Sequence, residues 1–217
     1  MFSYKKITIL IVSLALFGCA TDDPNLRAKT GATIGAIAGA IIGHQIDHSS
    51  GRFAGAALGA LAGGVTGDYM DKQQLEFENE LKQEQKQHAL EIQRLEDESL
   101  KIDISNEVSF DFAKSDIKQT FRTTLNKIVA LLNKYDRTQI EVTGHTDSIG
   151  SESYNLQLSE QRAQNVVDYF IRRGVAPGRL TVIAAGEYYP RATNETEAGR
   201  QLNRRVEIII KPLVEKI

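Results

Sequence analysis

The second half of this sequence predicts an α/β sandwich in which a mixed β-sheet is covered by helices on one side. Three observations support this prediction. Short runs rich in β-branched residues alternate apolar and polar side chains, as half-buried strands do. Between these runs, apolar residues recur every three or four positions, as they do on amphipathic helices. From residue 100 onward, segments of the two kinds follow one another in the order expected for helices packed on a sheet.

The first elements of this domain, which we place at residues 100–217, are expected to be a β-hairpin and a helix. The runs at 100–104 and 107–112 alternate in polarity, and Ser105 and Asn106 between them suit a tight turn. A helix should follow, because the next apolar residues fall on one helical face: Ile117, Phe121, Leu125, Ile128 and Leu132.

A strand–helix–strand unit is expected next, followed by a last strand. The strand at 139–144 should point Ile140 and Val142 inward, and further strands are expected at 180–186 and 204–210. The helix between the first two of these strands carries one apolar face, formed by Ala163, Val166, Val167, Phe170 and Ile171.

Residues 71–99 are predicted to form a charged helical linker in front of this domain. They contain no proline or glycine, and they are rich in Glu, Gln, Lys and Leu, which favour helix. Their apolar residues keep no heptad, so a coiled coil is not expected. A helix through residues 68–100 would be about 50 Å long and would hold the domain away from what precedes it.

Residues 26–70 carry glycine at every fourth position, which predicts a glycine-zipper helical hairpin with a polar turn at 44–52. Glycine costs about 1 kcal/mol in a solvated helix relative to alanine, so the regular spacing indicates close contact between helices. Each arm is short for a membrane span, and two alternatives stay open. Residues 31–67 either insert in a bilayer, as a hairpin or homo-oligomer, or form a glycine-rich spacer in water.

Residues 1–18 have the order of a secretory signal peptide, with two lysines, an apolar run and a small residue before Cys19. The sequence Leu16–Cys19 resembles the bacterial lipobox, which implies cleavage before Cys19 and acylation of its sulfur. Several acyl chains would anchor the protein stably in membrane lipid. By the same resemblance, Ala20 favours sorting to the outer membrane. The alternative is a free cysteine behind an ordinary signal peptide.

The bulk composition excludes several functions. The net charge of −2, without a dense basic block, argues against nucleic-acid binding. Cys19 is the only cysteine, so no intrachain disulfide can form. His44 and His48 lie four residues apart but have no third ligand nearby, and neither a metal nor a cofactor is expected.

Asp147 and Arg162 form the most informative pair of charges. Asp147 lies in the turn after the strand at 139–144, and Arg162 lies beside the apolar face of the next helix. With its stem along apolar surface, this arginine would offer a carboxylate two parallel hydrogen bonds. The aspartate would suit an ammonium group. If both face one pocket, they fit a carbon that carries an ammonium and a carboxylate, and they reject ligands that lack either charge.

Four motifs carry a family resemblance: residues 110–117, 143–170, 184–190 and 203–208. In this order they resemble the OmpA-like C-terminal domain, and a similar domain occurs in the peptidoglycan-associated lipoprotein. The resemblance covers about residues 101–211. It implies non-covalent binding of peptidoglycan through the diaminopimelate of the stem peptide, whose side chain ends in an amino-acid centre.

The resemblance also implies roles for single residues. Asp147 would hold the ammonium of diaminopimelate, and Arg162 would hold its carboxylate. The pocket would be lined by Phe112, Ala113 and Leu158. Several relatives have a polar side chain in place of Ala113, so a side-chain hydrogen bond from that position is lost here.

The polar residues around this pair are given supporting roles. Arg204 and Arg205 would support the site from a second layer or contact the glycan stem. The alternative is that both are ordinary charges at the start of a strand. Tyr154, Asn155 and Ser159 are expected to cap and pack rather than contact the ligand.

The expected protein is a non-enzymatic outer-membrane lipoprotein whose periplasmic domain tethers the membrane to the cell wall. One alternative is a hydrolase, because His145, Asp147 and Ser148 are triad residues, but they are crowded into four positions. A second is a stator-like partner protein, which would need an acid within a long apolar helix. A third is a glycine-zipper membrane oligomer involved in envelope integrity or stress, with the C-terminal domain only as an anchor.

Overall fold

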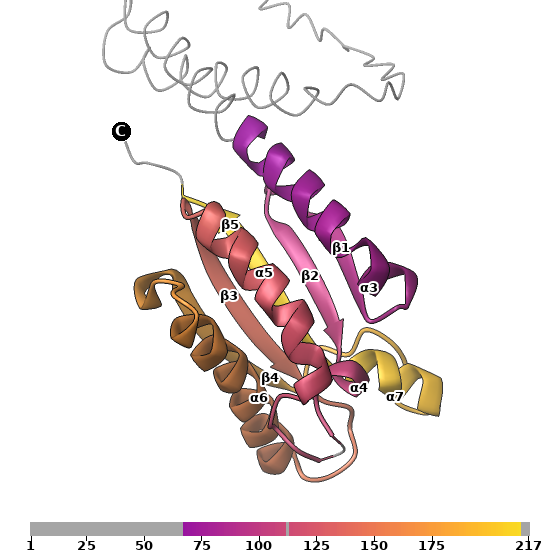
Figure 1. Ribbon diagram of the computed structural model, residues 1–217. Helices are drawn as coiled ribbons and strands as arrows, with labels where there is room; N and C mark the ends of the chain where they lie inside the picture. Colours follow the sequence, from indigo (N-terminus) through magenta and orange to yellow (C-terminus); the bar gives the residue numbers. More distant parts are fainter. Residues whose placement is uncertain (1–66, 112, 214–217) are drawn as a thin grey trace, which may run out of the picture.

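The computed structural model describes residues 67–111 and 113–213, which fold around a five-stranded β-sheet (Figure 1). The strand order is β1-β2-β5-β3-β4. β3 and β4 run parallel, and the other neighbouring strands run antiparallel, so the predicted mixed sheet is confirmed. The strands are β1 (Leu90–Arg94), β2 (Leu100–Ser105), β3 (Thr138–His145), β4 (Leu180–Gly186) and β5 (Arg205–Pro212).

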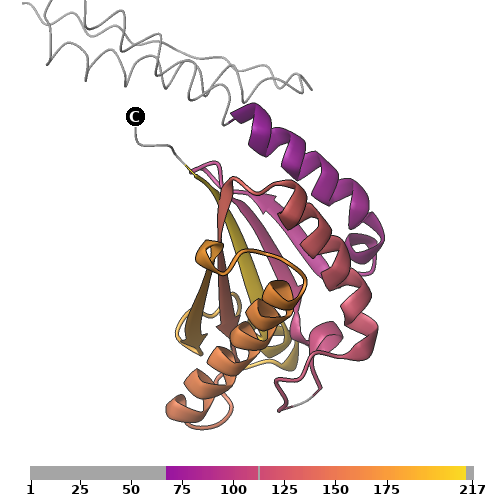
Figure 2. The same ribbon diagram turned by 60° about the vertical axis from the view of Figure 1, so that its left-hand side comes forward.

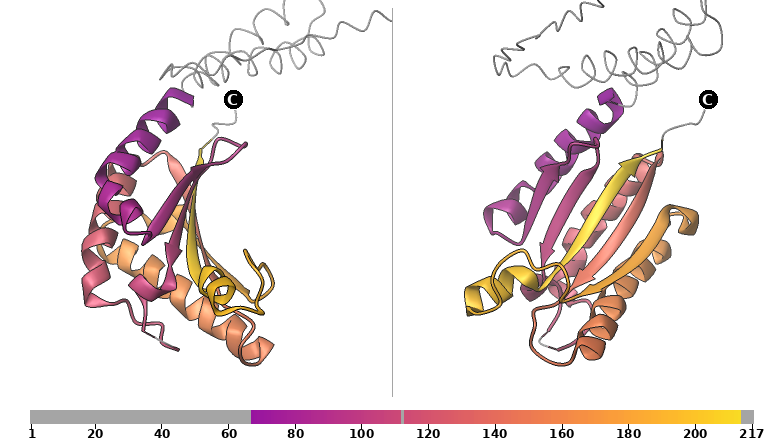
Figure 3. Two further views of the ribbon diagram at one scale, coloured as in Figure 1. Left: turned by 90° about the vertical axis from the view of Figure 1, so that its right-hand side faces the viewer. Right: turned by 180° about the vertical axis from the view of Figure 1, so that it is seen from behind.

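The long helices cover one face of this sheet, as predicted (Figure 3, left). They are the helix at 67–80, α5 (Arg122–Lys134) and α6 (Glu152–Arg172). Figure 3 (right) shows that α7 lies at one end of the sheet, away from α6. The short helices are α3 (Lys82–Lys86), α4 (Asn106–Ser109), η1 (Gln119–Phe121), η2 (Pro177–Arg179) and α7 (Glu197–Asn203).

The core contains every second residue of the inner strands, because successive side chains of a strand point to opposite faces of the sheet. The apolar residues of the three inner strands that point to the helices are almost completely buried: Ile102, Ile104, Ile140, Val142, Val206, Ile208 and Ile210. Their neighbours along each strand point to the opposite face. There Lys101 Nζ lies 3.0 Å from Asp103 Oδ2 and 3.9 Å from Glu207 Oε1.

The apolar faces predicted for α5 and α6 are buried as expected, apart from one residue in each set. Ile117 lies before the helix and forms an isolated β-bridge with Phe110. Ile171 is 38% exposed near the end of α6.

The predicted hairpin between 100–104 and 107–112 is wrong. β2 is already hydrogen-bonded on both edges, to β1 on one side and β5 on the other, so no edge remains for the second run. That run begins with α4 instead. Ser109 Oγ donates a hydrogen bond to the Ser105 carbonyl at 2.9 Å, and the Phe110 N–H donates to the Asn106 carbonyl at 2.8 Å.

The predicted linker at 71–99 is also wrong, because this segment is part of the folded domain. The helix at 67–80 packs on the same core as α5, and Met70, Phe77 and the following Leu81 are all 0% exposed. Figure 2 shows this helix lying along α5. A short apolar stripe on a charged helix therefore marks a docked helix, not a solvated spacer.

The remainder of the predicted linker forms β1, which pairs with β2 along its whole length. Two non-glycine residues with positive φ interrupt the helical path, His88 (φ 53°) and Glu98 (φ 66°). Helix propensity is a weak preference, and here the burial of Leu90 against the core and the pairing of β1 override it.

Several predictions fall outside the described residues, namely the signal peptide at 1–18, the acylated Cys19 and most of the glycine-zipper hairpin at 26–70. Within residues 67–111 and 113–213, no helix combines the length and apolar character needed to cross a membrane.

Candidate functional site

Close packing of α6 on the parallel strands positions Asp147 and Arg162. Asp147 lies just beyond the end of β3, and Arg162 lies halfway along α6. Gly144 of β3 permits this approach, because a Cβ there would lie only 2.0 Å from the carbonyl oxygen of Ser159. The hydroxyl of Ser159 accepts a hydrogen bond from the N–H of Gly186 in β4 at 3.0 Å. The helix is therefore fixed to both strands.

The Asp147 carboxylate is nearly buried and is held from two sides. The residue is 7% exposed. Its Oδ1 accepts a hydrogen bond from the Ile149 N–H at 3.0 Å, and its Oδ2 accepts one from Nη1 of Arg204 at 2.7 Å. The amide of Asn155 donates to the Asp147 carbonyl at 3.2 Å. An ionised carboxylate has about four acceptor positions, so this one can still accept from a further donor.

Arg162 is more deeply buried, at 2% exposed. Its Nε donates a hydrogen bond to the Lys114 carbonyl at 3.0 Å, and its guanidinium carbon lies 5.5 Å from the centre of the Phe110 ring. Burial lowers the pKa of Arg162 to about 10, although Tyr154 and Asp147 nearby raise it. The group is thus charged at neutral pH. Across the described residues, no carboxylate forms an ion pair with it.

The loops at 110–118 and 146–151 lie at the same end of the sheet (Figures 1 and 2). Two side chains of α6 hold the first loop, because Asn165 donates to the Ser115 carbonyl at 2.8 Å next to the bond from Arg162. The two predicted charges are therefore set in one framework that is fixed by backbone contacts.

The structure describes two of the three residues that were predicted to line the pocket. Ala113 belongs to the first loop, where it is exposed and adopts a positive φ of 56°. Leu158 is 9% exposed and precedes Arg162 by about one turn of α6. Phe112 lies outside the described residues.

The structure separates the two arginines that the sequence groups together. Arg204 contacts Asp147 directly and so belongs to the candidate site. Arg205 lies on the opposite face of the sheet from the helices, where its Nη2 is 2.6 Å from Glu207 Oε1 and donates to the Tyr189 carbonyl at 3.3 Å. Only Arg204 therefore remains a candidate for direct support of the ligand.

Two contacts at this site were not foreseen from sequence. Asn155 is buried as a packing residue should be, but it also joins the Asp147 loop to the end of β4 through Glu187 Oε2, at 2.6 Å. The Lys114 carbonyl orients Arg162, and a backbone oxygen leaves no signal in the sequence. For the contact of Asn155, the hint in the sequence was the polar residue itself, near the start of α6.

His145, Asp147 and Ser148 do not form a hydrolase triad. His145 is 4% exposed, and its Nε2 lies 3.6 Å from Glu207 Oε1, beyond hydrogen-bonding distance. Asp147 is bound to Arg204, whereas Ser148 is exposed and its N–H donates to Asn194. The described part of the chain also contains no group of three or more His, Cys, Asp or Glu residues that could hold a metal ion.

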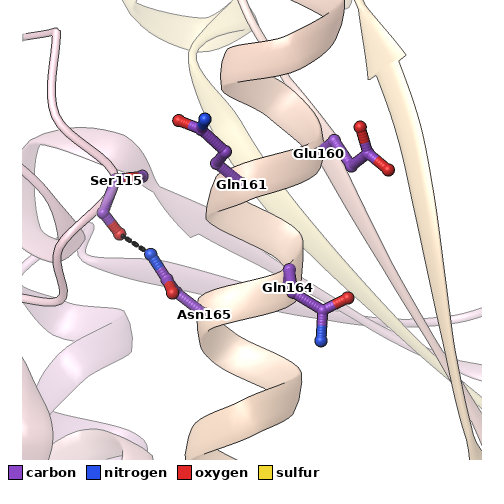
Figure 4. Close-up of a pocket in the computed structure, with 5 residues that line it drawn as sticks. All are labelled: Ser115, Glu160, Gln161, Gln164 and Asn165. Atoms are coloured by element: carbon purple, nitrogen blue, oxygen red, sulfur yellow. Dashed lines mark hydrogen bonds between the residues drawn. The ribbon is translucent and has the colours of Figure 1, made fainter.

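Two surface hollows lie near this end of the molecule, and neither contains Asp147 or Arg162. The hollow in Figure 4, of about 440 Å³, lies between α6 and the first loop. Gln161 extends toward the side of Ser115, and Glu160 and Gln164 extend away from it. A second hollow of about 530 Å³ includes Arg204 in its wall. The buried charges, rather than the cavity volume, therefore identify the candidate site.

Comparisons with known proteins identify the family of this domain. The model of the OmpA family matches residues 109–204, and that of the YMGG-like Gly-zipper matches residues 1–71, so the predicted zipper segment is confirmed as a family feature. The outer-membrane lipoprotein YfiB of Pseudomonas aeruginosa is 38% identical over 116 residues, covering 54% of this chain and 69% of YfiB. The peptidoglycan-binding protein ArfA of Mycobacterium tuberculosis is 41% identical over 86 residues, covering 40% of this chain and 26% of ArfA.

A solved structure supports the same assignment. The cell wall anchor of the T6SS from Pseudomonas aeruginosa is 29% identical with a TM-score of 0.57, covering 63% of this chain and 96% of that one. The chain spans only 13–57% of the length of the first curated relatives that it matches. The matched family is non-enzymatic, as the sequence predicted. Through the domain that carries Asp147 and Arg162, this chain belongs to the OmpA family.

Proposed function

We propose that this protein is an outer-membrane lipoprotein that binds peptidoglycan non-covalently and so tethers the membrane to the cell wall. Its ligand is the diaminopimelate of the stem peptide. Asp147 accepts hydrogen bonds from the ammonium group, and Arg162 donates to the carboxylate. Phe112, Ala113 and Leu158 line the pocket, and the acylated Cys19 holds the chain in lipid.

The burial of Arg162 is the observation that carries this proposal. The side chain of Arg162 is 2% exposed, and among the described residues its lost solvation is offset by one carbonyl hydrogen bond and a ring contact but by no ion pair. Such groups are typical of binding sites rather than of structural ion pairs. A carboxylate ligand would supply the missing partner, and the neighbouring acid accounts for the second charge of an amino-acid centre.

The names of three relatives support the wall-binding and outer-membrane parts of the proposal. ArfA is named for peptidoglycan binding, the T6SS structure is a cell wall anchor, and YfiB is an outer-membrane lipoprotein. The shared domain therefore occurs in a peptidoglycan-binding protein, in a cell wall anchor and in an outer-membrane lipoprotein. In this chain the element joined to it is the Gly-zipper segment.

The proposal is tested by co-sedimentation of the full-length protein, purified in detergent, with isolated cell-wall sacculi. Asp147→Ala and Arg162→Ala should each weaken binding by at least about 30-fold, because each leaves a buried charge unpaired. The double variant should not co-sediment. Arg172→Ala is the matched control, since Arg172 is an exposed arginine on the same helix. Binding of the double variant at the wild-type level would refute the assignment.

A second candidate function is favoured by the match to the YMGG-like Gly-zipper at residues 1–71. In that case the zipper forms a membrane oligomer that acts in envelope integrity or stress, and the wall-binding domain only anchors it. Blue native gels of the chain with and without residues 26–67 separate the two functions. An unchanged assembly size after the deletion would exclude the oligomer.

A further inference from the structure

We infer that Arg204 is the positioning residue of this site and that it makes α7 and α4 part of the binding apparatus. The inference rests on the proposed function and explains how Asp147 is prepared for the ammonium. One guanidinium joins three segments of the chain. Its Nη1 lies 2.7 Å from Asp147 Oδ2, and its Nη2 lies 2.7 Å from Glu197 Oε1 and 3.7 Å from Glu107 Oε1.

The four side chains joined by this guanidinium differ in their exposure to solvent. The side chains of Arg204 and Asp147 are 15% and 10% exposed, whereas those of Glu197 and Glu107 are 66% and 50% exposed. The planar guanidinium carries several N–H donors in a fixed geometry, so it can hold acids on two sides at once. Glu197 and Glu107 thus hold Arg204 from the solvent side, and Arg204 fixes the carboxylate of Asp147 on the inner side.

The outer acids also explain why Arg204 does not block the ligand. An arginine bound to Asp147 alone would neutralise the charge that should attract an ammonium group. Here the positive charge of Arg204 is balanced by Glu197 and Glu107, so the negative charge of Asp147 remains available. Together with the Ile149 N–H, Arg204 also fixes the carboxylate orientation before the ligand arrives, which reduces the loss of conformational freedom on binding.

The test measures binding of meso-diaminopimelate to the full-length protein in detergent by isothermal titration calorimetry. Arg204→Ala should weaken binding about tenfold, the usual size for losing a hydrogen bond to a charged group. Glu197→Gln should weaken it by a smaller factor, and because Glu197 is mostly exposed, this variant should fold normally. Arg172→Ala is the matched control, since Arg172 is an exposed arginine on α6 and lies outside α4 and α7.

A double-mutant cycle separates positioning from general destabilisation. If Arg204 acts through Asp147, adding Arg204→Ala to Asp147→Ala should cause no further loss, whereas independent effects would add. Additive losses, or wild-type binding by both Arg204→Ala and Glu197→Gln, would overturn the inference. Wild-type binding by Asp147→Ala itself would instead refute the proposed function, so the two failures are distinguishable.

Discussion

Single residues set the geometry of this site as much as its charges do. Gly144 and Ser159 bring α6 so close to β3 that a side chain on the glycine would collide with backbone. That contact decides how far Arg162 lies from the end of the strand that delivers Asp147. The spacing of the two charges therefore depends on a residue without a side chain.

Gly144→Ala should destabilise the protein and weaken ligand binding together. The added Cβ would lie 2.0 Å from the carbonyl oxygen of Ser159, so the helix must move, with an expected loss of about 1–3 kcal/mol in unfolding free energy. Urea denaturation followed by circular dichroism measures this loss. Gly178→Ala is the control, because nothing lies within 4 Å of its added Cβ. Equal midpoints for the two variants would contradict the packing argument.

At the scale of elements, the helix at 67–80 is the clearest difference between the sequence-based expectation and the structure. Its charged composition suggested a solvated spacer, but three of its contacts show docking on α5 and the turn that follows it. Tyr69 packs edge-on against the Tyr135 ring at 5.2 Å, its hydroxyl accepts a hydrogen bond from the Arg137 N–H, and Glu76 pairs with Lys134 at 2.7 Å. The Gly-zipper segment therefore joins a rigid element, not a flexible tether.

Phe77→Ala tests whether this helix belongs to the fold. The ring is fully buried, so its removal should lower the unfolding free energy by about 3–5 kcal/mol. Leu75→Ala, on the same helix but 58% exposed, should change it by less than about 0.5 kcal/mol. Thermal or urea unfolding of the full-length protein provides the comparison. If both variants unfolded like wild type, the helix would be a spacer after all.

At the scale of the whole molecule, the folded unit includes residues 67–99 and uses both faces of its sheet. The helices cover one face, and the other carries charges from β2, from β5 and from the segment after β4. In this cluster Glu207 lies 2.6 Å from Arg205, and Asp103 lies 3.0 Å from Lys101 and 3.2 Å from Arg191. The stability of the fold at low pH therefore depends on the ion pairs of this sheet face.

Glu207 should make the protein less stable as the pH falls from about 4.5 towards 2. Burial by itself raises the pKa of Glu207, but His145 and Arg205 outweigh it and lower the pKa to about 2 from its usual 4.5. Because the folded-state value is depressed, the stabilisation is present above pH 4.5 and disappears through this window, with a maximum of about 3 kcal/mol.

The measurement is unfolding free energy against pH for wild type, Glu207→Gln and the exposed-residue control Glu160→Gln. The Glu207 variant should show a flatter acid limb, and the control should follow wild type. Burial raises the pKa of Asp103, which acts in the opposite sense, so the effect of Glu207 is seen only by comparing variants. A Glu207→Gln profile parallel to wild type would refute this assignment.

The sequence alone determined the parts of this protein that depend on local pattern. Alternation and helical periodicity fixed β3, β4, β5, α5 and α6, because each buries one face and its side chains must repeat with the period of the backbone. The sequence also predicted that Asp147 follows the end of β3 and that Arg162 lies on the next helix, because both positions belong to one strand–helix–strand unit.

Only the tertiary structure decided the contacts between distant segments. The composition of residues 71–99 predicts a helix, but part of this segment forms β1 and pairs with one edge of β2. Residues 107–112 have the alternation of a strand, but both edges of β2 are already paired with other strands. Arg204 reaches Asp147 across 57 positions of the chain, and the acids that balance it lie on two other elements. Strand pairing and ion pairing of this kind are long-range, and no local periodicity records them.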